Sequence, residues 1–294
     1  MLLHRHRAPP RGIEEWNRSG ITVSFGYNLL REELLPGMAN HLRSTYRLFR
    51  AAVRTPRQLP RFVREWRAYQ RLNTLPSMKV RFNSLWPVLH EYQSSAGLAA
   101  DYYFHQDLWA ARKIYEARPR RHVDVGSRID GFIAHLLVFM PVEYVDIRPL
   151  PPVRNLTVVQ ADATRLDMFA DNSLPSLSSL NVAEHFGLGR YSDPIDPAAC
   201  FTFMSALART LAPEGRLYFA APVGRERVEF NAHRVFSLET VLAQFRGLRL
   251  VSFSYVDDAG HLHEEVEPAS FPQDSEFACG LFEFTKERQK GRGQ

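Results

Sequence analysis

The chain has 294 residues, of which 45% are hydrophobic and 23% are charged, a balance typical of a globular protein with one large domain, alone or with an extension. No run of about 18 apolar residues occurs, so we expect no transmembrane helix. The first residues lack the apolar core of a signal peptide. Cys200 and Cys279 lie too far apart in sequence to indicate a metal cluster or a disulfide framework. We therefore expect no bound metal and a cytoplasmic location.

The net charge of +5 is concentrated at one end of the chain. Residues 1–72 contain 14 arginines and five glutamates, a net charge of +9, so the remaining residues carry −4. The basic character therefore belongs to an N-terminal extension, which we place at residues 1–99. Because the rest of the chain is acidic, the high isoelectric point does not predict a nucleic-acid partner.

Two amphipathic helices are predicted within this extension. Apolar residues recur at helical spacing between Met38 and Val53, and again after Pro60. Arginines of the second helix fall outside its apolar face. Two interpretations stay open: the apolar faces pack against the rest of the protein or against each other, or residues 38–72 form a basic surface that contacts an anionic membrane or a protein partner.

The elements expected after the extension alternate between helices and strands. Helices are expected over 101–117, 131–140, 197–211 and 237–245, and strands over 121–125, 143–146, 157–161, 176–181, 216–220, 248–256 and 277–285. This order predicts an α/β, Rossmann-like, doubly wound fold with a mostly parallel seven-stranded sheet. The last two strands have no evident helix between them, so we expect an antiparallel edge strand. The domain would span residues 100–286, followed by a polar tail over 287–294.

Three acidic residues follow three successive predicted strands. Asp124 begins a turn that contains Gly126 and Gly131, and Asp146 ends the second strand 20 residues after Gly126. Nucleotide-binding folds place a ribose-binding carboxylate at about this distance. Asp162 ends the third strand. Since the carboxyl ends of parallel strands open into one crevice, Asp146 could accept the ribose hydroxyls of an adenosine and Asp162 its exocyclic amine.

The turn itself indicates which adenosine cofactor to expect. A dinucleotide-binding turn needs glycine where this chain has Arg128, because backbone must approach a pyrophosphate closely. S-adenosylmethionine has no phosphate and does not make this demand. The sequence therefore favours S-adenosylmethionine over NAD, with a nicotinamide-dependent oxidoreductase as a less favoured alternative.

These motifs resemble those of class I S-adenosylmethionine-dependent methyltransferases over residues 121–223. The matching segments are Asp124-Val-Gly126, Asp146, Asp162-Ala163 and Leu211-Ala-Pro-Glu-Gly215. More narrowly, residues 100–286 resemble an uncharacterised methyltransferase-like family, the domain of unknown function 268. That resemblance is carried by the segments 122–127, 184–196 and 230–234. Arg128 departs from the methyltransferase motif, in which a second glycine is usual, and so allows a non-catalytic member.

The motifs and the resemblance together imply a set of site residues. We expect the cofactor to contact Asp124, Gly126, Ser127, Arg128, Asp146, Ile147, Asp162, Ala163 and Asn181. The expected catalytic residues are His185, Glu184 and His233, and the expected substrate-binding residues are Arg190, Tyr191, Asn231 and Arg234. Imidazole titrates near neutral pH, so His185 is the preferred base for a hydroxyl acceptor, although a structural hydrogen bond is an equal alternative. Glu184 could instead orient the loop or contact the cofactor.

Two functions follow from this site. The first is methyl transfer from S-adenosylmethionine to a small polar acceptor, with O-methylation of a sugar or glycan precursor as the reaction suggested by the resemblance. The second is a catalytically degenerate, methyltransferase-like binding module that the basic helices recruit to a membrane or protein partner. Arg128 and the extension motivate this alternative.

Overall fold

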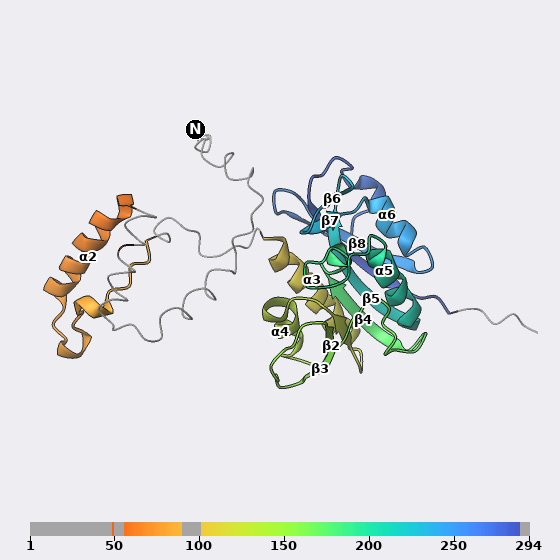
Figure 1. Cartoon of the computed structure of the whole chain (residues 1–294), viewed down its shortest axis with the longest axis horizontal. Helices are drawn as coiled ribbons and strands as arrows, with labels where there is room; N and C mark the ends of the chain where they lie inside the picture. The colour runs from red at the N-terminus through yellow and green to blue at the C-terminus, as the bar shows by residue number, and fades with distance from the viewer. Residues whose placement is uncertain (1–48, 50–55, 90–100, 289–294) are drawn as a thin grey trace, which may run out of the picture. The chain divides into compact units, whose positions relative to one another are not determined.

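The computed structural model describes residues 49, 56–89 and 101–288. The chain divides into two units, residues 1–96 and 97–294, which are shown together in Figure 1 and are described separately below. Most of the helix predicted between Met38 and Val53 lies outside the described residues. Within the described ranges, every helix is too short or too polar to cross a membrane.

The described part of the first unit contains one long helix, α2 (Leu59–Leu72), which confirms the second predicted amphipathic helix. Pro60 lies in its first turn, where the missing amide hydrogen of proline costs no hydrogen bond. The helix ends at Asn73, whose backbone N–H donates to the carbonyl of Tyr69 and whose side chain accepts from the N–H of Leu75. Two single 3₁₀ turns follow, Pro76–Met78 and Phe82–Ser84.

The second unit is built on an eight-stranded sheet. Its strands, in spatial order, are β3 (Leu156–Gln160), β2 (Val142–Asp146), β1 (Val123–Val125), β4 (Leu174–Leu180), β5 (Leu211–Val223), β10 (Ala278–Thr285), β8 (Arg249–Val256) and β9 (Leu262–His263). The first five are parallel, β10 is antiparallel to both of its neighbours, and β9 is an antiparallel edge strand. The predicted Rossmann-like, mostly parallel fold is confirmed.

The predicted number of seven strands is wrong, because the polar loop after β8 contains the short strand β9. Asp257 shapes this loop: its carboxylate accepts hydrogen bonds from the backbone N–H groups of Ala259 and His261 and contacts Nε2 of His263 at 2.9 Å. The turn folds the chain back onto β8, where His263 pairs with Tyr255. A strand of two residues carries too little hydrophobic pattern to be seen in the sequence.

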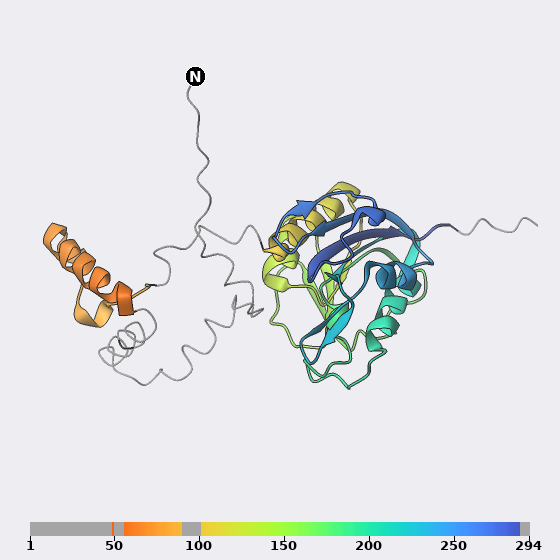
Figure 2. The same ribbon diagram turned by 90° about the horizontal axis from the view of Figure 1, so that it is seen from above.

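Helices cover both faces of the sheet, as Figures 1 and 2 show. On one face lie α3 (Tyr102–Ala117) and α4 (Ala134–Leu136), and on the other lie α5 (Ala199–Thr210) and α6 (Leu238–Gln244). Each layer has its own apolar core. The first core includes the buried side chains of Trp109, Ile114, Phe132, Leu136 and Tyr218, and the second includes those of Phe203, Leu207, Phe219, Val241 and Phe282. Burying one such side chain contributes roughly 1.5–3 kcal/mol, so these two cores hold the helices against the sheet.

The helix predicted over 131–140 is shorter and less regular than expected. The chain forms a π-helical turn over Ile129–Ile133 and only then the single α-helical turn α4. Close packing of α3 explains the position of Gly131, because a Cβ there would lie 2.2 Å from Oδ2 of Asp107. The helix predicted from Pro197 begins at Ala199, because the Asp196 carboxylate accepts the N–H of Ala198 in a preceding turn.

The helix α6 begins as predicted, with the Ser237 hydroxyl accepting the N–H of Thr240. Between β5 and α6 the chain adds a separate antiparallel hairpin, β6 (Arg227–Glu229) and β7 (His233–Val235), which the sequence did not predict. Residues 230–232 are its turn. This hairpin and the loop between β4 and α5 are the two segments that shape the candidate site.

Candidate cofactor-binding and active site

A cavity of about 230 Å³ lies at the carboxyl ends of β1, β2 and β3. The strand order reverses between β1 and β4, and open α/β sheets bind ligands in the crevice outside such a switch point. Five of the residues expected to contact a cofactor line this cavity, namely Gly126, Asp146, Ile147, Asp162 and Ala163. His185 and Tyr191 line it as well.

The glycine turn after β1 is fixed by its backbone. Gly126 has φ +71°, a conformation that side chains other than glycine rarely adopt, and its N–H donates to the carbonyl of Val145 at 2.9 Å. A Cβ at this position would also lie 2.8 Å from Cγ1 of Val182. Glycine is therefore required here both for the turn and for the space beside the cavity.

Asp124 is fully buried beneath this turn and does not line the cavity. Its carboxylate accepts hydrogen bonds from the backbone and hydroxyl of Ser127, at 3.0 and 2.7 Å, and from the hydroxyl of Ser178. Burial raises the pKa of Asp124 to about 7, against the lowering effect of these donors. The Ser127 hydroxyl in turn accepts the N–H of Leu180. Asp124 and Ser127 thus hold the turn in place from below.

Asp146 enters the cavity with its carboxylate already bound. Oδ1 accepts the backbone N–H and Nε of Arg148, at 2.8 and 2.9 Å, while Oδ2 accepts Nη2 of Arg148 at 2.6 Å and the Tyr144 hydroxyl at 2.9 Å. Burial opposes ionisation, but these donors outweigh it and lower the pKa of Asp146 below its usual value. The Arg148 guanidinium also lies 4.7 Å from the ring centroid of Tyr191. Sequence reasoning missed Arg148, although it stands only two residues after the expected ribose-binding acid.

Asp162 has one oxygen engaged and one available. Its Oδ1 accepts the backbone N–H and the hydroxyl of Thr164, at 2.8 and 2.6 Å. Among the described residues, no donor bonds Oδ2. Apolar atoms of Val145, Ile147 and Ala163 line the same cavity. The cavity therefore combines apolar lining atoms with a carboxylate oxygen that can accept a hydrogen bond, a combination that suits a purine with an exocyclic amine.

A second polar cluster lies at the carboxyl end of β4. Asn181 donates through Nδ2 to Oε1 of Gln106 on α3, at 2.7 Å. Its Oδ1 and Oε2 of Glu184 are both buried, and among the described residues neither has a hydrogen-bond partner. Burial raises the pKa of Glu184 to about 8 and that of Asp107 to about 6. Neither Asn181 nor Glu184 lines the cavity at β1–β3. Buried acceptors without a donor are rare, so this cluster is suited to a cationic ligand group such as an amine.

Arg128 contacts Asp130 and Tyr103 of α3. Its Nε donates to Oδ1 of Asp130 at 2.7 Å, and its guanidinium lies 5.0 Å from the ring centroid of Tyr103 on α3. The side chain that replaces the usual glycine thus points toward α3 and Asp130 and is absent from the lining of the cavity. The side chain of Arg128 therefore does not occupy the part of the cavity beside Gly126.

His185 lies in a 3₁₀ turn after β4 and faces the cavity. Its Nδ1 lies 2.8 Å from the carbonyl of Ala232 and 3.3 Å from Nη1 of Arg190. The shorter contact is to a carbonyl, which only accepts, so Nδ1 carries the hydrogen, and Arg190 donates to the same carbonyl. Nε2 then has a free lone pair, 3.7 Å from Oε1 of Glu184. Burial and the charge of Arg190 lower the pKa of His185 to about 4, so the imidazole is neutral at pH 7.

The loop that follows is tied together by one carboxylate. Asp193 accepts the N–H groups of Gly187 at 2.7 Å and Tyr191 at 3.1 Å, and it lines the cavity. Arg190 donates to the carbonyl of Ala232 at 2.9 Å and lies 5.3 Å from the Tyr191 ring. Tyr191 of this charged loop therefore lies against the cavity, and Arg190 connects the loop to the β6–β7 hairpin.

The remaining expected residues lie on or beside that hairpin. Arg234 is buried and donates to the carbonyls of Phe186 at 2.6 Å, Glu184 at 3.3 Å and Pro197 at 3.4 Å. His233 has its pKa lowered, first by burial, although Glu229 raises it in part. Asn231 and His233 are absent from the lining of the cavity at β1–β3 and of a second cavity that contains Arg234.

The sheet defines the class of fold. Five parallel strands in the order β3-β2-β1-β4-β5, followed by the antiparallel β10 and then β8, form a doubly wound, Rossmann-like sheet. A family model described as "Caenorhabditis protein of unknown function, DUF268" matches residues 159–267, which confirms the predicted resemblance over those residues. No curated protein sequence matches the chain.

Solved methyltransferase structures are similar at low identity. N-methyltransferase NodS from Bradyrhizobium japonicum WM9, in complex with S-adenosyl-L-homocysteine, is 13% identical with a TM-score of 0.43, over 63% of this chain and 88% of that one. The 1,6-didemethyltoxoflavin-N1-methyltransferase of Burkholderia thailandensis is 17% identical with a TM-score of 0.41, over 64% and 84%. An S-adenosylmethionine-dependent methyltransferase from Clostridium acetobutylicum ATCC 824 is 12% identical with a TM-score of 0.43, over 63% and 92%.

Proposed function

We propose that this protein is an S-adenosylmethionine-dependent methyltransferase. The observation that carries the proposal is the convergence of Gly126, Asp146, Asp162 and His185 on one cavity at the switch point of the sheet. Asp146 would hold the ribose and Asp162 the adenine amine. Oδ1 of Asn181 and Oε2 of Glu184, which have no hydrogen-bond partner among the described residues and lie outside the lining of the cavity, would receive the amino group of the cofactor. The residues present therefore fit this cofactor.

The cofactor supplies a methyl group on a positively charged sulfur when it is bound. The protein contributes mainly position, since methyl transfer is an in-line displacement. For a hydroxyl acceptor, Nε2 of His185 has the free lone pair needed to take a proton. The carboxylate of Glu184, 3.7 Å away, would stabilise the imidazolium that results. His185 is thus the base and Glu184 its partner in this proposal, while methylation of a sugar or glycan precursor stays a prediction.

The proposal is tested by calorimetric titration of the full chain with S-adenosylmethionine, S-adenosylhomocysteine and NAD. We expect binding of the first two and not of NAD. Asp146→Ala should abolish binding, because it removes the ribose acceptor. Asp274→Ala is the matched control, since Asp274 is exposed and lies outside the cavity. Equal affinity of folded Asp146→Ala and wild-type protein would refute the assignment.

One observation favours the second candidate, a non-catalytic binding module. The guanidinium of Arg148 already donates hydrogen bonds to both carboxylate oxygens of Asp146. The side chain of Arg148 therefore occupies the acceptor that a ribose would bind. In addition, α2 presents Arg61, Arg64, Arg67 and Arg71 beside the single acid Glu65. Arg57 lies in the 3₁₀ turn before this helix, and the side chains of Leu72, at its end, and Met78, in the turn that follows, are exposed. If folded protein binds neither cofactor form, a membrane or protein partner at this basic surface becomes the better proposal.

A further inference from the structure

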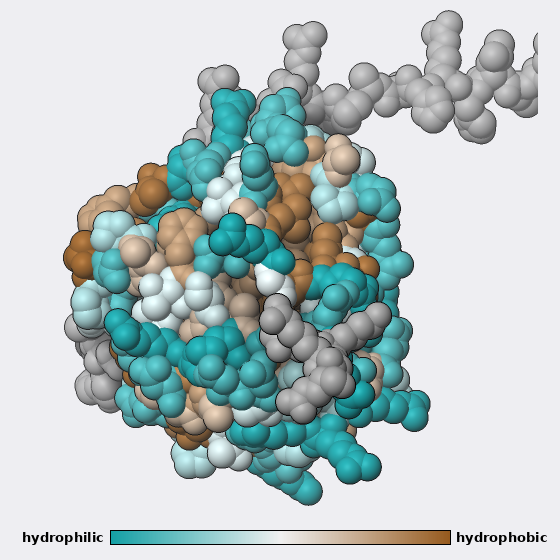
Figure 3. All heavy atoms as spheres, turned by 90° about the vertical axis from the view of Figure 1, so that its right-hand side faces the viewer, coloured by the Kyte–Doolittle hydropathy of each residue, from teal (hydrophilic) through white to brown (hydrophobic). Residues whose placement is uncertain are grey.

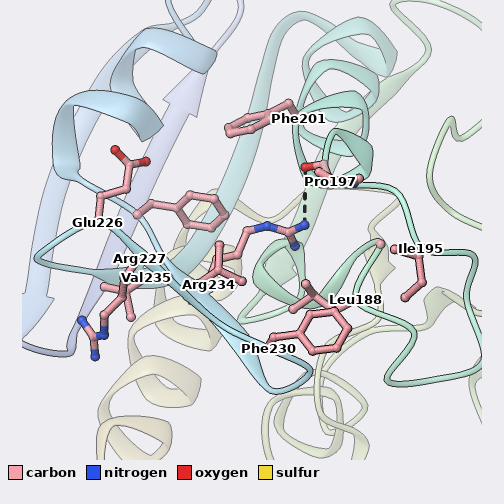
Figure 4. Close-up of a pocket in the computed structure, with 12 residues that line it drawn as sticks. Leu188, Ile195, Pro197, Phe201, Glu226, Arg227, Phe230, Arg234 and Val235 are labelled. Carbon is pink, nitrogen blue, oxygen red and sulfur yellow. Dashed lines mark hydrogen bonds between the residues drawn. The ribbon is translucent and has the colours of Figure 1, made fainter.

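A second cavity, of about 340 Å³, lies between the β4–α5 loop, α5 and the β6–β7 hairpin (Figure 4). Its volume falls within the range of small-molecule sites. Apolar side chains form most of its lining, including Leu188, Ile195, Phe201, Val228, Phe230 and Phe236. Figure 4 shows Leu188 and Ile195 on the β4–α5 loop, Phe201 on α5 and Phe230 on the turn of the hairpin.

Several of these apolar side chains remain largely exposed to solvent in the folded protein. Phe230 is 73% exposed, Ile195 63% and Val228 58%, although all three line the cavity. The face of the molecule drawn in Figure 3 is largely hydrophilic, with apolar groups gathered in part of it. Exposed apolar groups around a concave site mark a place where a ligand can be buried.

This cavity adjoins the cofactor cavity. Gly187 lines both of them, so one stretch of backbone separates the two spaces. A side chain at this position is excluded, because a Cβ would lie 1.8 Å from the carbonyl oxygen of Asp196. Arg234, which lines the second cavity, donates to the carbonyl of Phe186, and His185 donates to Ala232 in the turn of the hairpin. The wall of the second cavity is therefore hydrogen-bonded to the proposed base.

The polar groups of the second cavity already have partners. Arg234 donates to three carbonyls, one of them that of Pro197, as the dashed line in Figure 4 shows. Arg227 binds Glu229 at 2.9 Å and the carbonyl of Glu276 at 2.7 Å, and Glu226 accepts the hydroxyl of Thr240. A free sugar would need a partner for each hydroxyl that it buries there, whereas a hydrocarbon ring would not.

We propose that this cavity binds an aromatic group of the methyl acceptor. The inference rests on the proposed methyltransferase function and narrows its substrate class. The acceptor is then a hydroxylated aromatic compound, or a polar group joined to an aromatic one, rather than a free sugar. The phenylalanines at 201, 230 and 236 supply ring faces and edges for such a group.

The test uses 1-naphthol as the probe and follows its fluorescence during titration with the full chain. Val228→Glu places a carboxylate at the exposed rim of the cavity, so we expect naphthol to bind at least tenfold more weakly. Val138→Glu is the matched control, because Val138 is 85% exposed in the turn after α4 and lies outside the cavity. Its naphthol affinity should equal that of the wild type. Excess methyl glucoside should not compete.

Failure of naphthol to bind, equal affinity in both variants, or competition by methyl glucoside would overturn the proposal. S-adenosylmethionine affinity is measured on the same samples by calorimetry, and neither variant should change it. If Val228→Glu weakens naphthol binding while the wild type binds no cofactor, the aromatic site is supported and the methyltransferase function fails. If cofactor binds and naphthol does not, the aromatic site fails and the methyltransferase function stands.

Discussion

Arg148 holds the carboxylate of Asp146 through two side-chain hydrogen bonds, of 2.9 and 2.6 Å, and its guanidinium packs over Tyr191. A ribose that binds Asp146 has to replace at least one of these bonds. Arg148 and Tyr191 both line the cavity. The side chain of Arg148 therefore contacts both the expected ribose acceptor, Asp146, and the ring of Tyr191.

Arg148→Gln should therefore tighten S-adenosylmethionine binding. A hydrogen bond to a charged group contributes about 1.5 kcal/mol, so removing the competitor should lower the dissociation constant about tenfold. Calorimetric titration of both proteins measures the change. Weaker binding by the folded variant would show that Arg148 instead helps to hold the cofactor.

Cofactor binding should release a proton at pH 7. The pKa of Glu184 is raised to about 8, first by burial, so this side chain is protonated in the free protein. A bound amine next to Glu184 would favour the carboxylate and expel the proton. Titrations in buffers of different ionisation enthalpy measure the release, which should disappear in Glu184→Gln. A buffer-independent binding enthalpy in the wild type would contradict the placement of the amine.

Glu184 should also make the free protein less stable as the pH rises. Its folded-state pKa lies above the unfolded value near 4.3, so the folded state binds the proton more tightly and stability falls between about pH 4 and pH 8. Glu184→Gln removes this pH dependence. The free energy of unfolding of the variant minus that of the wild type should therefore be at least about 2 kcal/mol larger at pH 8 than at pH 5. Urea denaturation at the two pH values checks this, and a constant difference would exclude the raised pKa.

Gly126→Ala should destabilise the fold and weaken cofactor binding together. The φ of +71° and the 2.8 Å approach to Val182 both oppose a Cβ, at a combined cost of roughly 1–3 kcal/mol. Gly247→Ala is the control, because a Cβ there meets no atom within 4 Å. Urea denaturation compares the two variants. Equal stability would mean that the turn after β1 relaxes without strain.

Charge reversal on α2 should abolish binding to anionic vesicles if this helix contacts a membrane. Each basic residue near such a surface contributes about 1 kcal/mol, so Arg64→Glu, Arg67→Glu and Arg71→Glu together should weaken binding at least about 100-fold. Vesicles of phosphatidylserine and phosphatidylcholine provide the measurement. A control reverses three arginines of the second unit, at positions 118, 120 and 246. Equal loss in both variants would indicate a general charge effect.

Much of the fold could be predicted because its signals are local in sequence. The strands from β1 to β5, β8 and β10 carry apolar runs bounded by turn residues, and α6 has its serine cap. The edge strand β9 and the β6–β7 hairpin were missed, because strands of two or three residues are formed by tertiary pairing rather than by periodicity. The close approach of Asp107 to Gly131, which excludes a Cβ there, comes from a segment distant in sequence and could not be predicted.

The sequence by itself determined the class of fold, the glycine turn and the two strand-end acids, Asp146 and Asp162, because parallel strands bring such positions to one edge. The tertiary structure decided what each side chain does there. It buried Asp124 under the turn, bound Asp146 to Arg148 and, among the described residues, left Oε2 of Glu184 without a hydrogen-bond partner. Burial and hydrogen bonding come from segments far apart in the chain, so residue type and spacing could not assign these roles.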